Sequence, residues 1–202
     1  MNCKKLLLIF TKNPELGKCK TRLAKTIGDE AALKIYRYLL QHTAKITQSL
    51  SVDKRVYYSN KILKNDNFSA ELFDKKVQQG KDLGEKMANA FREGFQDGYE
   101  DIVIVGSDLF ELSQTDIEEA FSALTTSDVV LGPAKDGGYY LLGMKTFLPE
   151  LFQQKKWSTS HVLKDTLADL QDKNVTLISE KNDIDEYKDM ENIPVLQQLL
   201  NS

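Results

Sequence analysis

Two uninterrupted apolar runs constrain the fold of this chain more than any other feature. They are Lys5–Phe10 (KLLLIF) and Ile102–Val105 (IVIV). Neither run alternates between apolar and polar residues, which is typical of strands buried on both faces of a sheet. Segments with apolar residues at helical spacing separate these runs from further candidate strands. The alternation predicts an α/β fold with a mostly parallel central sheet covered on both faces, and we expect residues 1–202 to form one domain.

The expected elements alternate along the whole chain. Besides the two apolar runs, strands are expected at 55–59, 71–78, 129–131, 139–144 and 175–178. Helices are expected at 30–50, 83–95, 115–124, 161–170 and 193–200, with a shorter helix beginning at Thr21. Thr115 and Glu118 have the spacing of a capping box at the start of the helix at 115–124.

Composition excludes several classes of protein. The 202 residues are 41% hydrophobic and 28% charged, as in ordinary globular proteins. The net charge of −3 provides no global basic field, so we expect no nucleic-acid partner. The N-terminal apolar run is too short to span a membrane and lacks a signal cleavage site. Cys3 and Cys19 form neither a disulfide framework nor a metal pattern, and we expect a cytoplasmic protein.

Four segments that follow expected strands are rich in charged residues and glycine. They are the loop at 12–22, Gly106-Ser107-Asp108, the loop around Asp136, and Asp183-Ile184-Asp185. In open parallel sheets, ligands bind beyond the carboxyl ends of the strands. We therefore expect these segments to meet at one edge of the sheet and to form a ligand site there.

The first of these segments is basic and lies just before a helix start. Its candidate ligand-binding residues are Lys12, Gly17, Lys18, Lys20, Thr21 and Arg22. Basic side chains next to the free N–H groups at a helix start suit a phosphate group. The loop contains neither the P-loop pattern nor the GxGxxG pattern of dinucleotide-binding proteins. The alternative interpretation is a solvated basic loop.

Carboxylates dominate the other three segments. Asp108 ends the second apolar run, where it can hold Mg²⁺, which usually takes one or two carboxylates plus substrate phosphates. Its alternative role is to cap the next turn. Asp183 and Asp185 share a face if their segment is extended, and a solvated turn is the alternative. Asp136 stands before a glycine pair, where backbone can approach a ligand closely, although such sequences also form plain β-turns.

Two further segments have both a functional and a structural interpretation. Gly80 and Asp82 precede the helix at 83–95. They either line the expected ligand site or form the start of that helix, with Asp82 as its N-cap. Trp157 precedes the helix at 161–170. Its ring suits stacking on a sugar or base, or anchoring in the core.

Taken together, these segments resemble one family. The sequence FTKNPELGKCKTRLA is followed by QGKDLGEKMANAF, IVIVGSD, VVLGPAKDGGYYLLG, WSTSHV and DIDEYKDM. This order is similar to the bacterial DUF2064 group of the GT-A glycosyltransferase superfamily. Members of that group are described as nucleotide-diphospho-sugar transferases. They are akin to nucleotidyltransferases such as the molybdenum-cofactor guanylyltransferase.

The resemblance implies a GT-A fold, which is a Rossmann-like three-layer α/β/α sandwich, and a role for each matching residue. Lys12, Gly17, Lys20, Thr21 and Arg22 match the nucleotide loop; Asp108 matches a metal-binding acid and Asp185 a second metal ligand; Asp136, Gly137, Gly138 and Tyr139 match the acceptor-side loop. Two departures stand out. Leu109-Phe110 follow Asp108 where the family has a small residue and proline, and Glu186-Tyr187-Lys188 interrupt the acidic turn near the end.

Three functions are compatible with these residues. The first is an Mg²⁺- or Mn²⁺-dependent transfer of a sugar from a nucleotide-sugar to a small-molecule acceptor, with Lys20 and Arg22 assisting the departing diphosphate and Asp136 as general base. The second is transfer of a nucleotidyl group from a nucleoside triphosphate to a phosphorylated acceptor, which needs no protein base. The third is a nucleotide-binding module without turnover. Sugar transfer is the reading that the resemblance favours.

Overall fold

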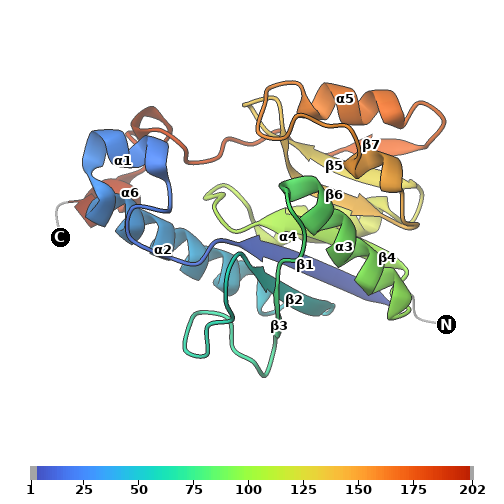
Figure 1. Cartoon of the computed structure of the whole chain (residues 1–202), viewed down its shortest axis with the longest axis horizontal. Coiled ribbons are helices and arrows are strands. Elements are labelled where there is room, and N and C mark those ends of the chain that lie inside the picture. Colours follow the sequence, from blue (N-terminus) through green and yellow to red (C-terminus); the bar gives the residue numbers. More distant parts are fainter. Residues whose placement is uncertain (1–3, 201–202) are drawn as a thin grey trace.

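A seven-stranded sheet with the strand order β3-β2-β1-β4-β6-β5-β7 forms the centre of the fold (Figure 1). The computed structural model describes residues 4–200. The strands are β1 (Lys5–Thr11), β2 (Asp53–Tyr58), β3 (Asp74–Val77), β4 (Asp101–Gly106), β5 (Val129–Pro133), β6 (Tyr139–Met144) and β7 (Val175–Leu177). The helices are α1 (Thr21–Ile27), α2 (Asp29–Thr47), α3 (Leu83–Gln96), α4 (Gln114–Ala123), α5 (Val162–Asp169) and α6 (Pro194–Leu200), with short 3₁₀ turns at Pro149–Phe152 and Tyr187–Asp189.

All strands except β6 run in the same direction. β1 pairs in parallel with β2 and β4, β2 with β3, and β5 with β7. β6 is antiparallel to both of its neighbours, β4 and β5, because the short loop after β5 returns the chain directly alongside that strand. The prediction of a mostly parallel α/β sheet is confirmed, and the single reversed strand lies in its interior.

Successive residues of the central strands enter two separate hydrophobic cores. Leu7 and Ile9 of β1 pack into a cluster that includes side chains of α2 and α4. Leu6 and Leu8 pack into a cluster on the opposite face, with side chains of α3 and of the segment around α5. Because both faces of β1 are covered by helices, neither has a polar residue, which explains the uninterrupted apolar run. The layers are therefore helix, sheet and helix, as expected.

A third cluster joins the two ends of the chain. Leu23 of α1 and Ile35 of α2 are fully buried against Ile184, Met190 and Leu196 of the C-terminal segment. Figure 1 shows α6 next to α1 and α2, on the side of the molecule away from α5. This packing fixes the acidic segment at 183–185 close to the basic loop after β1, although more than 160 residues separate them in the sequence.

The start of α4 differs from the prediction. The capping box is formed by Ser113 and Asp116, not by Thr115 and Glu118. Ser113 has the extended backbone of an N-cap, and its Oγ accepts a hydrogen bond from the Asp116 backbone N–H while the Asp116 carboxylate accepts one from Ser113 N. Thr115 already lies within the first helical turn, where its backbone cannot serve as a cap. The helix expected at 193–200 is present, with Pro194 as its first residue.

Asp116 also ties α4 to the segment after β7. Its carboxylate lies 3.0 Å from Lys181 Nζ, and both side chains are largely buried. Lys181 in turn exchanges backbone hydrogen bonds with the end of β5 and with Lys135, so this ion pair supports the loop that carries Asp136. Burial alone would raise the pKa of Asp116, but the hydrogen bonds from Ser113 and the pairing with Lys181 lower it below its ordinary value of 3.8.

Replacing Asp116 by Asn is expected to lower the free energy of unfolding at pH 7 by about 1–3 kcal/mol, the usual worth of a hydrogen bond to a charged group. Because the folded state lowers the pKa of Asp116, its contribution is complete well above pH 3.8 and declines as the pH falls below that value. Urea unfolding of both proteins from pH 7 to pH 3 measures this difference. The exposed neighbour Glu118→Gln is the control, and a difference that stays undiminished at pH 3 would contradict the assignment.

Two remaining findings concern membrane-spanning segments and the cysteines. No helix among residues 4–200 is long and apolar enough to cross a membrane. Cys19 is a buried free thiol that donates to the Asn13 carbonyl oxygen, and Cys3 lies outside the described residues.

Candidate functional site

The carboxyl ends of β1, β4, β5 and β7 lie at the same edge of the sheet, as predicted. The parallel pairing of β1 with β4 and of β5 with β7, and the antiparallel pairing of β6 with both β4 and β5, require this arrangement. The four charged segments that follow these strands are therefore neighbours. Contacts between their side chains define a candidate active site.

The first contact joins the basic loop to β4. Lys20 Nζ lies 2.8 Å from Asp108 Oδ2, and the Lys20 side chain is only 5% exposed while that of Asp108 is 46% exposed. Burial alone would raise the pKa of Asp108, but the Lys20 ammonium, helped by Lys12, lowers it. Asp108 is therefore a carboxylate with one oxygen held by Lys20 and a side chain that solvent or a ligand can reach.

Tyr36 and Asn13 hold the beginning of this loop in place, and neither role is predictable from the sequence alone. The Tyr36 hydroxyl accepts a hydrogen bond from Lys12 N at 2.9 Å and lies within hydrogen-bonding distance of Thr11 Oγ1 and Ser107 Oγ. The Asn13 side chain bonds the backbone after β2 at residues 60 and 61. Tyr36 lies within the helix expected at 30–50, and its hydroxyl partners are far from it along the chain, which hides this role in the sequence.

A second contact joins α1 to the acidic segment near the C-terminus. Arg22 Nη1 lies 2.7 Å from Asp185 Oδ2, so these two predicted ligand-binding residues pair with each other. Asp183 instead faces the sheet edge, where it lines the same cleft as Asp108 and Asp136. Burial raises the pKa of Asp183; Lys20 offsets this in part, and the carboxylates of Asp108, Asp136 and Asp185 reinforce it. The structure thus separates the two acids that the sequence placed together.

The loop between β5 and β6 is a tight turn closed by Asp136. Its Oδ1 accepts a hydrogen bond from Gly138 N at 2.8 Å, and no described residue donates to its other oxygen. Gly137 has a φ of +87°, and its carbonyl oxygen accepts from Leu163 N. The β-turn interpretation is therefore confirmed. The turn also presents the exposed Asp136 carboxylate to the cleft.

A cleft of about 320 Å³ lies between this turn and the end of β4. Three carboxylates line it, from Asp108, Asp136 and Asp183, and Trp157 and Tyr139 provide aromatic walls. Trp157 packs against the second core cluster and lies so close to α3 that a Cβ at Gly84 would come within 2.4 Å of its Nε1. Trp157 is therefore both a core anchor and a wall of the cleft.

The other predicted ligand-binding residues lie around this centre rather than in the cleft. Lys18 is exposed and pairs with Glu15, and Gly17 forms the loop turn with a φ of +71°. Asp82 accepts from Glu85 N as the N-cap of α3, which confirms its structural interpretation. The remaining members of the set neither line the cleft nor contact Asp108: Lys12, Thr21 and Gly80.

The departure at Leu109-Phe110 has a structural role. Leu109 is buried in the first core cluster and lines the floor of the cleft. The Phe110 ring lies against Tyr38 and His42 of α2, with centroid distances of 6.4 and 5.5 Å. These apolar side chains anchor the turn after Asp108. The interrupted acidic turn is closed by Asp189, which accepts hydrogen bonds from Asp185 N and Glu186 N.

The donor set suits a divalent cation that also binds the substrate. Among residues 4–200, no three Asp, Glu, His or Cys side chains are close enough together to hold a metal ion by themselves. Mg²⁺ dehydrates reluctantly and usually combines one or two protein carboxylates with water and substrate phosphates. Asp108 and Asp183 line one cleft, and the Asp108 side chain is half exposed, so these carboxylates fit that mode of binding.

Comparisons with known proteins support the resemblance seen in the sequence. A family model described as an uncharacterized protein conserved in bacteria (DUF2064) matches residues 42–159, more than half of the chain. This span includes Asp108 and Asp136 but not the basic loop. Among solved structures, a candidate nucleotide-diphospho-sugar transferase from Desulfovibrio desulfuricans G20 is 29% identical, with a TM-score of 0.87 over 99% of this chain and 95% of that chain.

More distant structures share the fold. A cytidylyltransferase from Leptospira borgpetersenii serovar Hardjo-bovis is 12% identical, with a TM-score of 0.62 over 94% of this chain and 84% of that chain. Rv0371c from Mycobacterium tuberculosis H37Rv, solved in complex with manganese, is 11% identical, with a TM-score of 0.59 over 98% and 99%. A comparison with curated proteins found no match. With the three-layer fold in place and more than half of its length matched, the chain belongs to the DUF2064 family of bacterial proteins.

Proposed function

We propose that this protein is a nucleotide-dependent transferase that moves a sugar from a nucleoside-diphosphate carrier to a small-molecule acceptor. The observation that carries this proposal is the juxtaposition of Lys20, Asp108 and Asp136 at one sheet edge, around a cleft with aromatic walls. The relative from Desulfovibrio desulfuricans, a candidate nucleotide-diphospho-sugar transferase, supports the choice of sugar transfer. Residues 1–202 form a single transferase domain in this proposal.

In this proposal Asp108 and Asp183 hold a divalent cation, Mg²⁺ or Mn²⁺. When bound, such an ion neutralises the charge of the departing diphosphate. Lys20 supplies a second positive charge at the same place, because its ammonium already lies against Asp108. Arg22 and the remaining cations of the basic loop attract the donor's phosphates. Asp185 orients Arg22 through their ion pair rather than binding the metal itself.

Asp136 acts as the general base on the acceptor. Its free carboxylate oxygen takes the proton of an acceptor hydroxyl while the acceptor oxygen forms a bond to the anomeric carbon of the sugar. The bond between that carbon and the diphosphate oxygen breaks, and the nucleoside diphosphate leaves with the bonding electrons. The hydrogen bond from Gly138 N fixes the other Asp136 oxygen and so orients the carboxylate.

Nucleotidyl transfer from a nucleoside triphosphate is the second candidate. Asp108 is flanked by Ser107 and Leu109 rather than by a second acid, so the end of β4 provides a single carboxylate. A phosphorylated acceptor is already a nucleophile, and positioning with charge neutralisation then suffices. In that reaction the acceptor phosphate attacks the α-phosphorus and pyrophosphate leaves. Asp136 is dispensable in this reaction.

Thermal unfolding in the presence of nucleotides tests the proposal, because a ligand that binds only the folded state raises the melting temperature. The set comprises nucleoside triphosphates, diphosphates and nucleotide-sugars, each with and without Mg²⁺. Sugar transfer predicts an Mg²⁺-dependent shift with a nucleotide-sugar that exceeds the shift with its parent diphosphate. A shift confined to one triphosphate would favour nucleotidyl transfer. No shift with any compound would contradict both.

The separate positions of Asp183 and Asp185 yield a prediction. Replacing Asp183 by Asn is expected to weaken Mg²⁺-dependent nucleotide binding by about 10–100-fold, because a carboxylate near the metal is lost. Replacing Asp185 by Asn removes the same charge two residues away but leaves the cleft intact, and we expect a change of less than about fivefold, the worth of an exposed ion pair. Calorimetric titration at fixed Mg²⁺ measures both, and the reverse order would return the metal-binding role to Asp185.

A further inference from the structure

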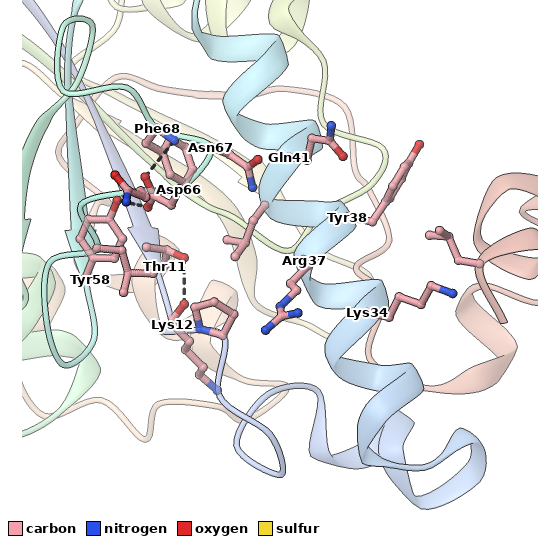
Figure 2. Close-up of a pocket in the computed structure, with 15 residues that line it drawn as sticks. Thr11, Lys12, Lys34, Arg37, Tyr38, Gln41, Tyr58, Asp66, Asn67 and Phe68 are labelled. Atoms are coloured by element: carbon pink, nitrogen blue, oxygen red, sulfur yellow. Dashed lines mark hydrogen bonds between the residues drawn. The ribbon is translucent and has the colours of Figure 1, made fainter. Parts of the chain in front are cut away.

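A second cavity opens on the α2 side of the molecule. It has a volume of about 550 Å³ and lies between α2, the end of β1 and the segment at 63–68. We name it the α2 groove. It shares no lining residue with the cleft that contains Asp108 and Asp136. Figure 2 shows Arg37 extending from α2 toward the end of β1, and Asn67 extending from the opposite wall toward α2.

The charges that face the α2 groove are positive. Lys12 and Arg37 line it, and no Asp or Glu among residues 4–200 lies within ion-pairing distance of either side chain. The lining contains one carboxylate, Asp66, and it is already neutralised. Its Oδ1 lies 2.7 Å from Lys75 Nζ, its Oδ2 accepts a hydrogen bond from the Tyr58 hydroxyl, and the side chain is only 13% exposed.

This arrangement fits an anion with several acceptor oxygens, such as a phosphate group. The guanidinium of Arg37 presents paired N–H donors that match the oxygens of a phosphate group, and Lys12 adds a second positive charge from the facing wall. The amides of Asn65 and Asn67 also line the groove and offer both donors and acceptors. A bare phosphate fills only part of the volume, and hydroxyl groups of an attached organic portion suit the amides.

We propose that the α2 groove binds a small phosphorylated molecule, with its phosphate between Arg37 and Lys12 and its organic portion against Asn67. Its lining has no residue in common with the cleft of the proposed transferase centre, although Lys12 also belongs to the basic loop, and the Tyr36 hydroxyl joins Lys12 to Ser107. Arg37 belongs to neither the cleft nor the basic loop, so a test at Arg37 does not depend on the reaction that the transferase centre catalyses.

Calorimetric titration without divalent metal tests this proposal with two probes, ribose 5-phosphate and inorganic phosphate. Replacing Arg37 by Gln is expected to weaken the binding of both probes by at least about tenfold, the loss of one charge-assisted pair of hydrogen bonds. Lys45→Gln removes the same charge from an exposed position of α2 outside the groove and is expected to leave both affinities within about twofold. Arg22→Gln controls for binding at the basic loop.

Replacing Asn67 by Ala separates the two sources of phosphate. Tighter binding of ribose 5-phosphate than of inorganic phosphate, with the difference lost in Asn67→Ala, identifies the ligand as an organic phosphate. Equal affinities that depend on Arg37 assign the groove to free phosphate. Binding that is unaffected by Arg37→Gln but lost in Arg22→Gln, or no binding of either probe, would overturn the proposal. Because Arg37 and Asn67 are exposed, the variants are expected to fold.

Discussion

Replacing Asp108 by Asn is expected to lower Mg²⁺-dependent turnover by about 10²–10³-fold, the loss found when one preorganised charge-stabilising group is removed. The substitution preserves the shape of the side chain and its capacity to accept a hydrogen bond from Lys20. It removes the negative charge that lowers the cost of bringing a cation to this edge of the sheet. Turnover and Mg²⁺-dependent nucleotide affinity should both fall, while circular dichroism stays unchanged.

The buried position of Lys20 complicates this variant, because its side chain is only 5% exposed and its ammonium loses its counter-charge. A double variant, Asp108→Asn with Lys20→Gln, removes both charges and should restore the melting temperature without restoring activity. Glu111→Gln, an exposed acid-to-amide change shortly after Asp108, is the matched control and should retain activity. Asp108→Asn protein that binds nucleotide with unchanged affinity and unchanged Mg²⁺ dependence would show that Asp108 does not bind the metal.

Gly137→Ala is expected to lower the free energy of unfolding by about 2–5 kcal/mol, from backbone strain together with overpacking. Gly137 has a φ of +87°, and an added Cβ would lie 2.2 Å from the carbonyl oxygen of Ser160. That atom belongs to backbone just before α5, so it cannot move aside as a flexible side chain would. The clash should push the Asp136 turn away from the segment that carries Trp157, and turnover should fall as the cleft widens.

Gly98 provides the control for the strain alone. It has a φ of +83°, but an added Cβ would meet nothing within 4 Å. Gly98→Ala is therefore expected to cost about 1–2 kcal/mol, with no effect on turnover. Urea unfolding of the two variants separates the clash from the strain. Equal losses of stability in both would mean that the contact between Gly137 and Ser160 is not tight in solution.

The sequence predicts most of this fold because local patterns and burial agree along the chain. The runs at 6–9 and 102–105 are apolar throughout since helices cover both faces of β1 and β4, and each was predicted as a doubly buried strand. The convergence of four charged segments followed from the rule that parallel strands end at one edge. The reversed direction of β6 follows from a short connection, which the Gly-rich turn at 136–138 makes possible.

The site was harder to predict where pairing depends on distant segments. Arg22 and Asp185 pair because the third cluster packs α6 against α1 and α2. The apolar spacing within α6 does not reveal which helices it packs against. Only the family resemblance favoured Asp185 as a metal ligand, whereas extended backbone predicts that Asp183 and Asp185 share a face. In the structure Ile184 between them is buried, and Asp189 accepts hydrogen bonds from Asp185 N and Glu186 N. The α2 groove was missed entirely, since its walls come from three separate segments.

Anomalous diffraction from crystals soaked with Mn²⁺ and a nucleotide tests the central claim most directly. The nucleotide is the one that produces the largest metal-dependent rise in melting temperature. We predict a manganese peak beside Asp108, with the phosphates of the nucleotide directed toward Lys20 and the loop at 12–22. A manganese ion and nucleotide bound elsewhere, with the cleft between Asp108 and Asp136 unchanged, would contradict the proposed transferase site.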